Sequence, residues 1–185
     1  KGKAAHAACA PELGRSALDS IELMNVGVNY LREHIPDAAR IHYAYLDAGG
    51  EAPNVVQAKT TVRQLIRSPS LEGLQSLVER VRNVAEGAAL MSGTAVTSKV
   101  FSAVSNLTKN EPLSEAMQAE FEALGPVVFD AKDELYAKSI RETLSREDIA
   151  DPFERLAMKP DYDLPLCNFI AKLDRPFMGG MGSTD

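Results

Sequence analysis

Histidine is the side chain most often used for acid–base chemistry near neutral pH, and the chain contains three. His34 comes at the end of a helical pattern and His42 lies in an alternating strand pattern, so both are expected to fill ordinary structural positions. His6 differs because it lies in the small-residue segment GKAAHAA, where backbone can approach a ligand closely. On the residues alone, a ligand contact and an ordinary loop position are both open for His6.

Metal-ligand spacings are absent from the sequence. It contains no His-x-Asp, His-x-x-x-His or Cys-x-x-Cys and no Glu-Glu pair, and three scattered histidines do not assemble a two-metal centre. Phosphate loops, dinucleotide fingerprints and nucleophile elbows are also missing, and the glycine-rich stretch 179–182 is expected to be a flexible turn. We therefore expect no metal site and no resident cofactor in this chain.

Composition and charge narrow the class of protein. The 185 residues are 45% hydrophobic and 25% charged, as in a globular protein with one main core. The formal charge is −6, from 20 Lys+Arg and 26 Asp+Glu. This balance gives no indication of a positively charged surface that would bind nucleic acid or anionic lipid. No apolar run is long enough for a bilayer span or a signal peptide. Cys9 and Cys167 are expected to be reduced thiols in a cytoplasmic protein.

Two amphipathic helices are predicted in the first half. Apolar residues recur at steps of three and four from Ser16 to Ile35, where Pro36 ends the pattern. A second stripe begins after Ser68-Pro69-Ser70 and continues to Gly93, a typical helix stop. Each helix therefore has one apolar face to bury.

Strand patterns lie between and around these helices. We predict a short extended start, strands at 40–46 and 54–67, and a further strand at 94–104. The order βαββαβ predicts an α+β fold of the ferredoxin-like type, an antiparallel sheet with two helices on one face. Beyond it we expect helices at 112–124 and 130–144 and an irregular tail over 151–185.

Several of these segments together carry a family resemblance. They are GKAAHAA (2–8), PELGRSALD (11–19), GGEAPNVV (49–56), Arg67 and GSTD (182–185). In this order they resemble the aminoacylase/glutamate-carboxypeptidase family of co-catalytic zinc amidohydrolases. The resemblance implies that residues 1–106 are the family's lid or dimerisation domain, that 107–150 are a helical extension, and that 151–185 are a partial return into a catalytic domain otherwise absent.

The resemblance also implies roles for particular residues. The histidine matching His6 and the asparagine matching Asn54 reach into the partner subunit's active site and hold the scissile carbonyl and its oxyanion. Arg67 matches an arginine that binds the substrate's carboxylate, and Gly182 and Thr184 match a glycine-rich substrate loop. The chain departs from the pattern at residue 57, a glutamine where many relatives have proline.

In the intact enzyme the resemblance implies two zinc or similar divalent ions, with their ligands and a general-base glutamate in flanking regions that this chain does not include. The reaction implied is hydrolysis of an amide bond to a carboxylate-bearing amino acid, with p-aminobenzoyl-glutamate as a candidate substrate. The chain alone is then expected to be inactive.

The separation of Asn54 and Arg67 along the chain bears on how such a site is shared between two subunits. Asn54 and Arg67 are 13 residues apart on one predicted strand, which corresponds to roughly 40 Å when fully extended. A two-fold homodimer through residues 1–106, or a pair with a related subunit, would bring the two ends together. The alternative is a stand-alone ferredoxin-like module that dimerises or binds a small effector without catalysis.

Overall fold

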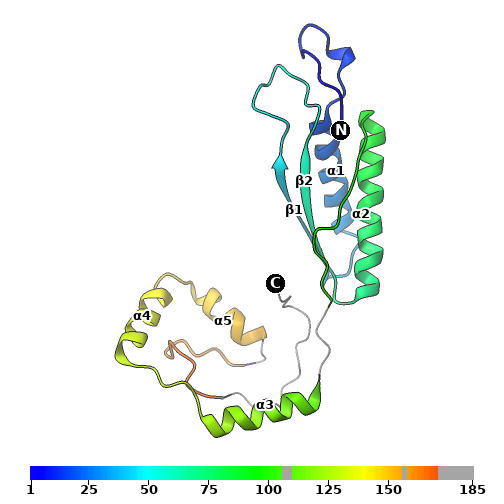
Figure 1. The fold of residues 1–185 in the computed structure, drawn as a ribbon. Helices are drawn as coiled ribbons and strands as arrows, with labels where there is room; N and C mark the ends of the chain where they lie inside the picture. Colours follow the sequence, from blue (N-terminus) through cyan, green and yellow to red (C-terminus); the bar gives the residue numbers. More distant parts are fainter. Residues whose placement is uncertain (106–109, 156–157, 171–185) are drawn as a thin grey trace. The chain divides into compact units, whose positions relative to one another are not determined.

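The computed structural model describes residues 1–105, 110–155 and 158–170. The chain divides into two compact units, residues 1–106 and 107–182, which we describe separately. The first unit contains a 3-10 turn (η1, Pro11–Leu13), helix α1 (Ala17–Arg32), strands β1 (Arg40–Asp47) and β2 (Thr61–Arg67), and helix α2 (Leu71–Ser92) (Figure 1). The predicted α+β class is therefore confirmed.

Both helices of the first unit begin and end where local chemistry favours it. The hydroxyl oxygens of Ser16 and Ser70 accept hydrogen bonds from backbone N–H groups in the first turns of α1 and α2, at 3.0 and 3.1 Å. Helix α2 ends at Gly93, whose φ of 64° is the left-handed conformation that glycine adopts without strain.

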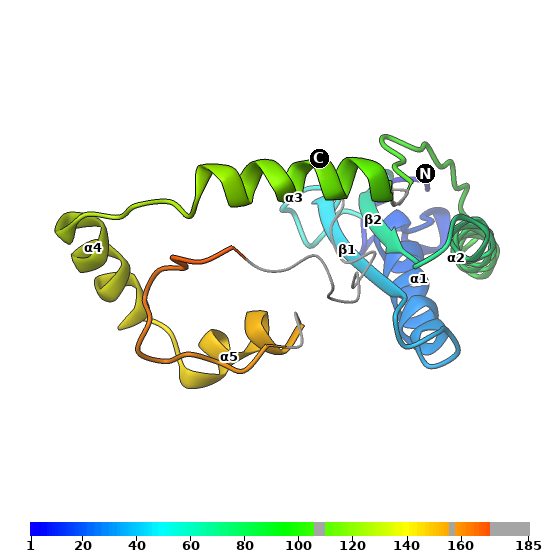
Figure 2. The same cartoon turned by 90° about the horizontal axis from the view of Figure 1, so that it is seen from below.

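The two strands pair antiparallel in a register that separates apolar from charged residues. Ile41 lies opposite Ile66, while Arg40 lies opposite Arg67, one residue away in each strand. The ladder is irregular near its far end, between Tyr45 and Asp47. Helices α1 and α2 lie on the same side of this sheet (Figure 2), so the apolar residues of the strands meet the apolar stripes of the helices.

The core lies between these two layers. Its centre is Val28 of α1, which is fully buried, and around it pack Met24, Leu31, Ala39, Ile41, Leu77, Val81, Ala85 and Ala88. The helices approach closely at Gly27, where a Cβ atom would lie only 2.7 Å from Cγ1 of Val84. The absence of a side chain at this position therefore sets the spacing between α1 and α2.

The predicted four-stranded order is wrong in the described residues 1–105, where only two strands form. The first segment makes single antiparallel bridges, Lys3 with Arg15 and His6 with Val55, rather than a ladder. The strand predicted over 54–67 begins only at Thr61. Its first half lies beyond the end of β1, so its backbone groups pair with the N-terminal segment instead.

Residues 94–104, predicted as a strand, form no strand. The segment approaches β2 through a side chain, since the ring of Phe101 lies under the Arg63 guanidinium at 5.5 Å. Its apolar residues Val96, Val100 and Phe101 remain exposed. Strand propensity reflects packing on a pleated surface, and these residues find no such surface here.

In its described residues, 110–155 and 158–170, the second unit contains three helices, α3 (Glu111–Leu124), α4 (Ala131–Arg141) and α5 (Arg146–Arg155). The first two were predicted. Helix α5 was not, because its Pro152 and charged residues obscure the period, although Ser145 and Asp148 form a capping box at its start. The hydrogen bonds from Ser145 lower the pKa of Asp148 below its ordinary value. Among the helices the structure describes, none has the length and apolar character of a membrane span.

Two glycines of the helices give a matched test of this packing. Gly27→Ala should destabilise the protein by about 1–2 kcal/mol, because overpacking against the stiff Val84 side chain outweighs the gain in helix propensity. Gly87→Ala should stabilise it by about 0.5–1 kcal/mol, since nothing lies within 4 Å of the added Cβ. Thermal unfolding followed by circular dichroism measures both changes. Equal gains from the two alanines would contradict the close approach at Gly27.

Candidate functional site

Two of the singled-out residues, His6 and Asn54, lie on neighbouring backbone segments. His6 pairs with Val55 in an antiparallel bridge. On one side of this bridge the Ala7 N–H donates to the Asn54 carbonyl oxygen at 2.9 Å, and on the other the Val56 N–H donates to the Ala5 oxygen at 3.0 Å. Residues 48 positions apart in the sequence are thus held together by the main chain.

Further backbone hydrogen bonds hold the N-terminal segment in place. Gly2 donates to the Ala58 oxygen at 2.8 Å, and Lys3 and Arg15 exchange two hydrogen bonds of 2.8 and 2.9 Å. A Cβ atom on Gly2 would lie 1.9 Å from the Arg15 oxygen, a distance that no side chain tolerates. The glycine in the motif GKAAHAA is therefore required by a close backbone approach.

The His6 ring is oriented by its own main chain. Its Nδ1 atom accepts hydrogen bonds from the N–H groups of Ala8 and Cys9, each at 3.2 Å. A ring nitrogen that accepts hydrogen bonds carries no hydrogen, so Nε2 is the nitrogen that bears the N–H. Because the side chain is exposed, this N–H is a hydrogen-bond donor available to a ligand.

Asn54 supplies a second exposed donor on the adjoining segment. It lies in a turn in which the Val55 N–H donates to the Ala52 oxygen at 3.2 Å. Among the described residues its side-chain amide has no hydrogen-bond partner, and the residue is exposed. An imidazole N–H and an amide NH₂ on neighbouring segments are groups that can hold a carbonyl oxygen or an oxyanion.

Arg67 is not brought to this pair within one chain. It lies at the opposite end of the sheet, paired with Arg40. Strand β2 alone separates the two ends by about 20 Å, at roughly 3.3 Å per residue. The separation of roughly 40 Å expected from the sequence required one extended strand over 54–67, which the structure shortens. Gly182 and Thr184 lie outside the described residues.

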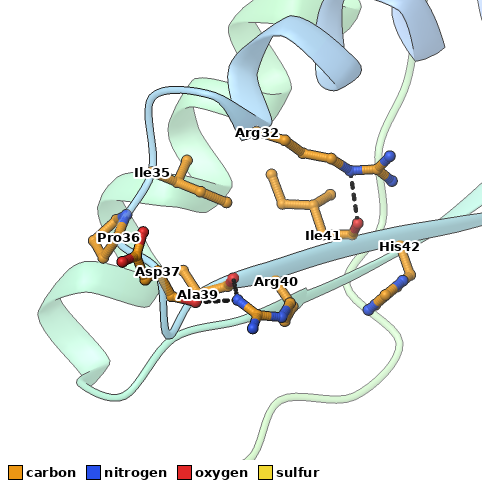
Figure 3. A pocket seen from close by; sticks show the side chains of 8 residues that line it. All are labelled: Arg32, Ile35, Pro36, Asp37, Ala39, Arg40, Ile41 and His42. Carbon is orange, nitrogen blue, oxygen red and sulfur yellow. Dashed lines mark hydrogen bonds between the residues drawn. The ribbon is translucent and has the colours of Figure 1, made fainter.

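A shallow hollow lies near the Arg67 end, between the end of α1 and the start of β1 (Figure 3). Its polar lining comes from Arg32, Asp37, Arg40 and His42, and its apolar lining includes Ile35 and Pro36. Sequence reasoning did not single out Arg40. The signal that could have found it was the hairpin register, which places residue 40 directly opposite residue 67 once the alternation of both strands is aligned.

The described residues do not fit a metal ion. None of their histidines, cysteines, aspartates and glutamates form a group of three or more that could hold one. Both cysteines are exposed free thiols. What this part of the chain can do chemically is to donate hydrogen bonds from His6 and Asn54 and to bind an anion with arginine.

Comparisons with known proteins agree with the family resemblance. No protein-family model matches the chain. It is 43% identical over 157 residues to a subunit of p-aminobenzoyl-glutamate hydrolase from Escherichia coli K12, covering 85% of this chain and 33% of that protein. It is 33% identical over 95 residues to mouse Xaa-Arg dipeptidase, covering 51% and 22%.

A solved structure is also similar, the crystal structure of an aminobenzoyl-glutamate utilization protein from Klebsiella pneumoniae. The TM-score is 0.53 at 25% identity, over 64% of this chain and 30% of that one. The chain spans about a third of the length of the E. coli relative. These similarities confirm the resemblance found in the sequence.

The orientation of the His6 ring is open to a direct measurement. We expect ¹⁵N nuclear magnetic resonance of the neutral side chain to show an unprotonated Nδ1 and a protonated Nε2, because two backbone N–H groups donate to Nδ1. His42, exposed on the sheet, provides the internal control and should populate both tautomers. A mixed tautomer at His6 would show that the turn does not orient the ring.

Proposed function

The chain is homologous to part of a p-aminobenzoyl-glutamate hydrolase, and from this premise we propose that residues 1–106 act as the lid and dimerisation domain of an amidohydrolase. The reaction is hydrolysis of an amide bond to a carboxylate-bearing amino acid, with p-aminobenzoyl-glutamate as the first candidate substrate. The main support is that the backbone segments carrying two exposed donors, His6 and Asn54, are paired with each other.

In this proposal His6 and Asn54 bind the scissile carbonyl oxygen. The Nε2–H of His6 and the side-chain NH₂ of Asn54 donate to that oxygen as negative charge develops on it during attack by water. Donors fixed in advance stabilise such charge without reorganisation at the moment of reaction, and losing one typically costs about 10²–10³ in turnover. Main-chain hydrogen bonds to Nδ1 of His6 supply part of that fixed geometry.

Arg67 binds the substrate's carboxylate in a different copy from the one that supplies His6. The length of β2 supports this division, because it keeps the arginine about 20 Å or more from His6 in one chain. Two copies related by a two-fold axis place the His6 end of one chain against the Arg67 end of the other and create two equivalent sites.

The contact between copies is proposed to run along β1. In the two-stranded sheet of the described residues, β1 pairs with β2 on one side and has no strand on the other. An unpaired strand edge is a template for another chain. On α1, in the helix layer that packs on this sheet, Val26 and Tyr30 are half or more exposed and add apolar surface. The partner is a second copy of this chain or a related subunit.

Two zinc or similar divalent ions are expected in the intact enzyme, where such a metal would activate the attacking water. The described residues do not provide ligands for it. We therefore assign to this chain only carbonyl binding, carboxylate binding and assembly. We place the enzyme in the cytoplasm, in keeping with the free thiols of Cys9 and Cys167.

Subunit complementation in the complete enzyme tests the shared site. His6→Ala and Arg67→Gln should each lower turnover by about 10²–10³. When the two inactive variants are mixed and allowed to exchange subunits, each mixed dimer should contain one site with both residues intact. About a quarter of wild-type turnover should return, since half of the dimers are mixed and half of their sites are complete.

Two outcomes would contradict this arrangement. Near-wild-type turnover of His6→Ala would remove the carbonyl-binding role. Inactive single variants that show no recovery after demonstrated subunit exchange would place His6 and Arg67 in one chain's site. Unchanged melting temperatures of the single variants serve as the control for folding.

Dimerisation itself can be tested with the 185-residue chain. Sedimentation at micromolar concentration should show a dimer. Leu46→Lys on β1 should weaken the dimer at least about tenfold, because a charge on an edge strand opposes pairing. Leu90→Lys near the end of α2 is the matched control, as this leucine is 84% exposed and lies on a helix rather than the strand edge. A monomer at high concentration would count against the dimer.

A further inference from the structure

Helix α3 carries an exposed apolar stripe. Its large apolar residues follow one another at steps of four, four and three, the spacing that places side chains on one face of a helix. They are Leu113, Met117, Phe121 and Leu124. Each is about half exposed or more, and within the part of the chain that the structure describes α3 has no buried residue. A contiguous exposed apolar surface of this kind marks an interaction site.

The opposite face of α3 is acidic. Helical spacing places Glu111, Glu115 and Glu122 there, and on the same face the Gln118 amide donates to Glu122 at 2.7 Å. The helix contains no lysine or arginine. A helix that is polar on one side and apolar on the other buries its apolar side against another element. The stripe is therefore the docking side of α3.

Helix α3 also needs such a contact for its own stability. It has 14 residues, and isolated helices of about this length or shorter are marginal in water. Its start is capped, because the Asn110 side chain accepts a hydrogen bond from the Leu113 N–H at 3.1 Å. Most of the stability of a helix in a protein nevertheless comes from packing of its apolar face.

The similarity to a longer protein indicates what covers the stripe. The alignment with the E. coli relative spans 157 residues, more than the whole first unit, so the similarity extends into the second unit. The chain covers 33% of that relative. The remainder is about twice the matched length, which is enough for a domain with a core and apolar surface of its own.

A second copy of α3 is a poorer partner for the stripe. Helical spacing places Glu120 beside the stripe, and the helix has no basic residue to pair with it. Two α3 helices packed stripe to stripe would therefore bring like charges together at their edges. The helix instead suits an apolar groove with a neutral or basic rim.

We propose that α3 is a docking helix, whose apolar stripe packs into a groove of the part of the proposed amidohydrolase that lies outside this chain. This inference rests on the proposed function, since it places the chain within that longer enzyme. It gives the two units different contacts. The first unit joins a second copy, and α3 joins the chain to the remainder of the enzyme.

Cysteine labelling tests whether the stripe is covered. Met117→Cys and Ala119→Cys are each made in the complete enzyme and in the 185-residue chain, in a background in which exposed cysteines, Cys9 and Cys167 among them, are replaced by serine. A maleimide should label Met117→Cys at least about tenfold more slowly in the complete enzyme than in the 185-residue chain, because packing shields the thiol from solvent. Ala119 is exposed and lies opposite the stripe, so Ala119→Cys should label equally fast in both.

Melting temperatures provide a second measurement. Phe121→Glu should lower the melting temperature of the complete enzyme by about 2–4 °C or more, because it places a charge in a packed contact. It should leave that of the 185-residue chain unchanged, since the side chain is about half exposed there. Ala119→Glu adds the same charge on the opposite face and should change neither.

Three results would overturn the inference. They are equal labelling of the two cysteine variants in the complete enzyme, equal melting-temperature changes from Phe121→Glu and Ala119→Glu, and protection of Met117→Cys in the 185-residue chain that grows with its concentration. The last would identify a second copy as the partner. Any of them together with recovered turnover in subunit complementation would remove the docking role of α3 and leave the proposed lid function standing. Protection of Met117→Cys without that recovery would support docking and contradict the shared site.

Discussion

The register of the β1–β2 ladder is the constraint on which the rest of the first unit depends. With Ile41 opposite Ile66, the apolar side chains of both strands meet the stripe of α1 that is centred on Val28. A slip of one residue would turn arginines into the core and isoleucines to solvent, a change that no other contact offsets. The burial of a few aliphatic side chains therefore also decides where the charged ones lie.

The same register divides the functional groups between two ends of one small sheet. His6 and Asn54 lie beyond the end of β1 on segments paired by main-chain hydrogen bonds, whereas Arg40 and Arg67 lie at the other end. At both ends backbone groups orient the side chains, through Nδ1 of His6 and Nη1 of Arg40. Part of the entropy cost of ordering these side chains is thus met when the protein folds, before any ligand binds.

The sequence was sufficient to predict the helices, which depend on local periodicity. It was insufficient to predict the strands, which depend on a second backbone segment to pair with. Helices α1 and α2 follow from apolar residues at steps of three and four and from stops at Pro36 and Gly93, all of which are local signals. Strand 94–104 was predicted from the same kind of signal, but a strand needs another backbone to pair with, and its residues do not form a ladder in the structure. For the same reason, the segment before Thr61 pairs with residues near the N-terminus instead of extending β2.

The candidate site likewise contains residues that could be found from the sequence and contacts that could not. His6 could be singled out because small residues surround it, and Asn54 and Arg67 because they match a family pattern. The contact between the His6 and Asn54 segments was not predictable from spacing, since 48 positions separate them and only the folded backbone brings them together. Arg40 required the hairpin register, which depends on burial of the opposite strand face.

The N-terminal segment also imposes an order on folding. The main-chain nitrogen of Lys1 donates to the Ala95 oxygen at 2.6 Å, across 94 positions of the chain, and the Ala95 N–H donates back to the Lys1 oxygen at 2.8 Å. Contacts of such long range form late, because the intervening chain must be ordered first. During synthesis on the ribosome, this closure must wait until residue 95 has emerged, whereas α1 and the hairpin can form earlier. Helix α1 and the hairpin can therefore assemble before Lys1 is tied to the segment after α2, whereas the His6 segment depends on its hydrogen bonds to residues 54–58.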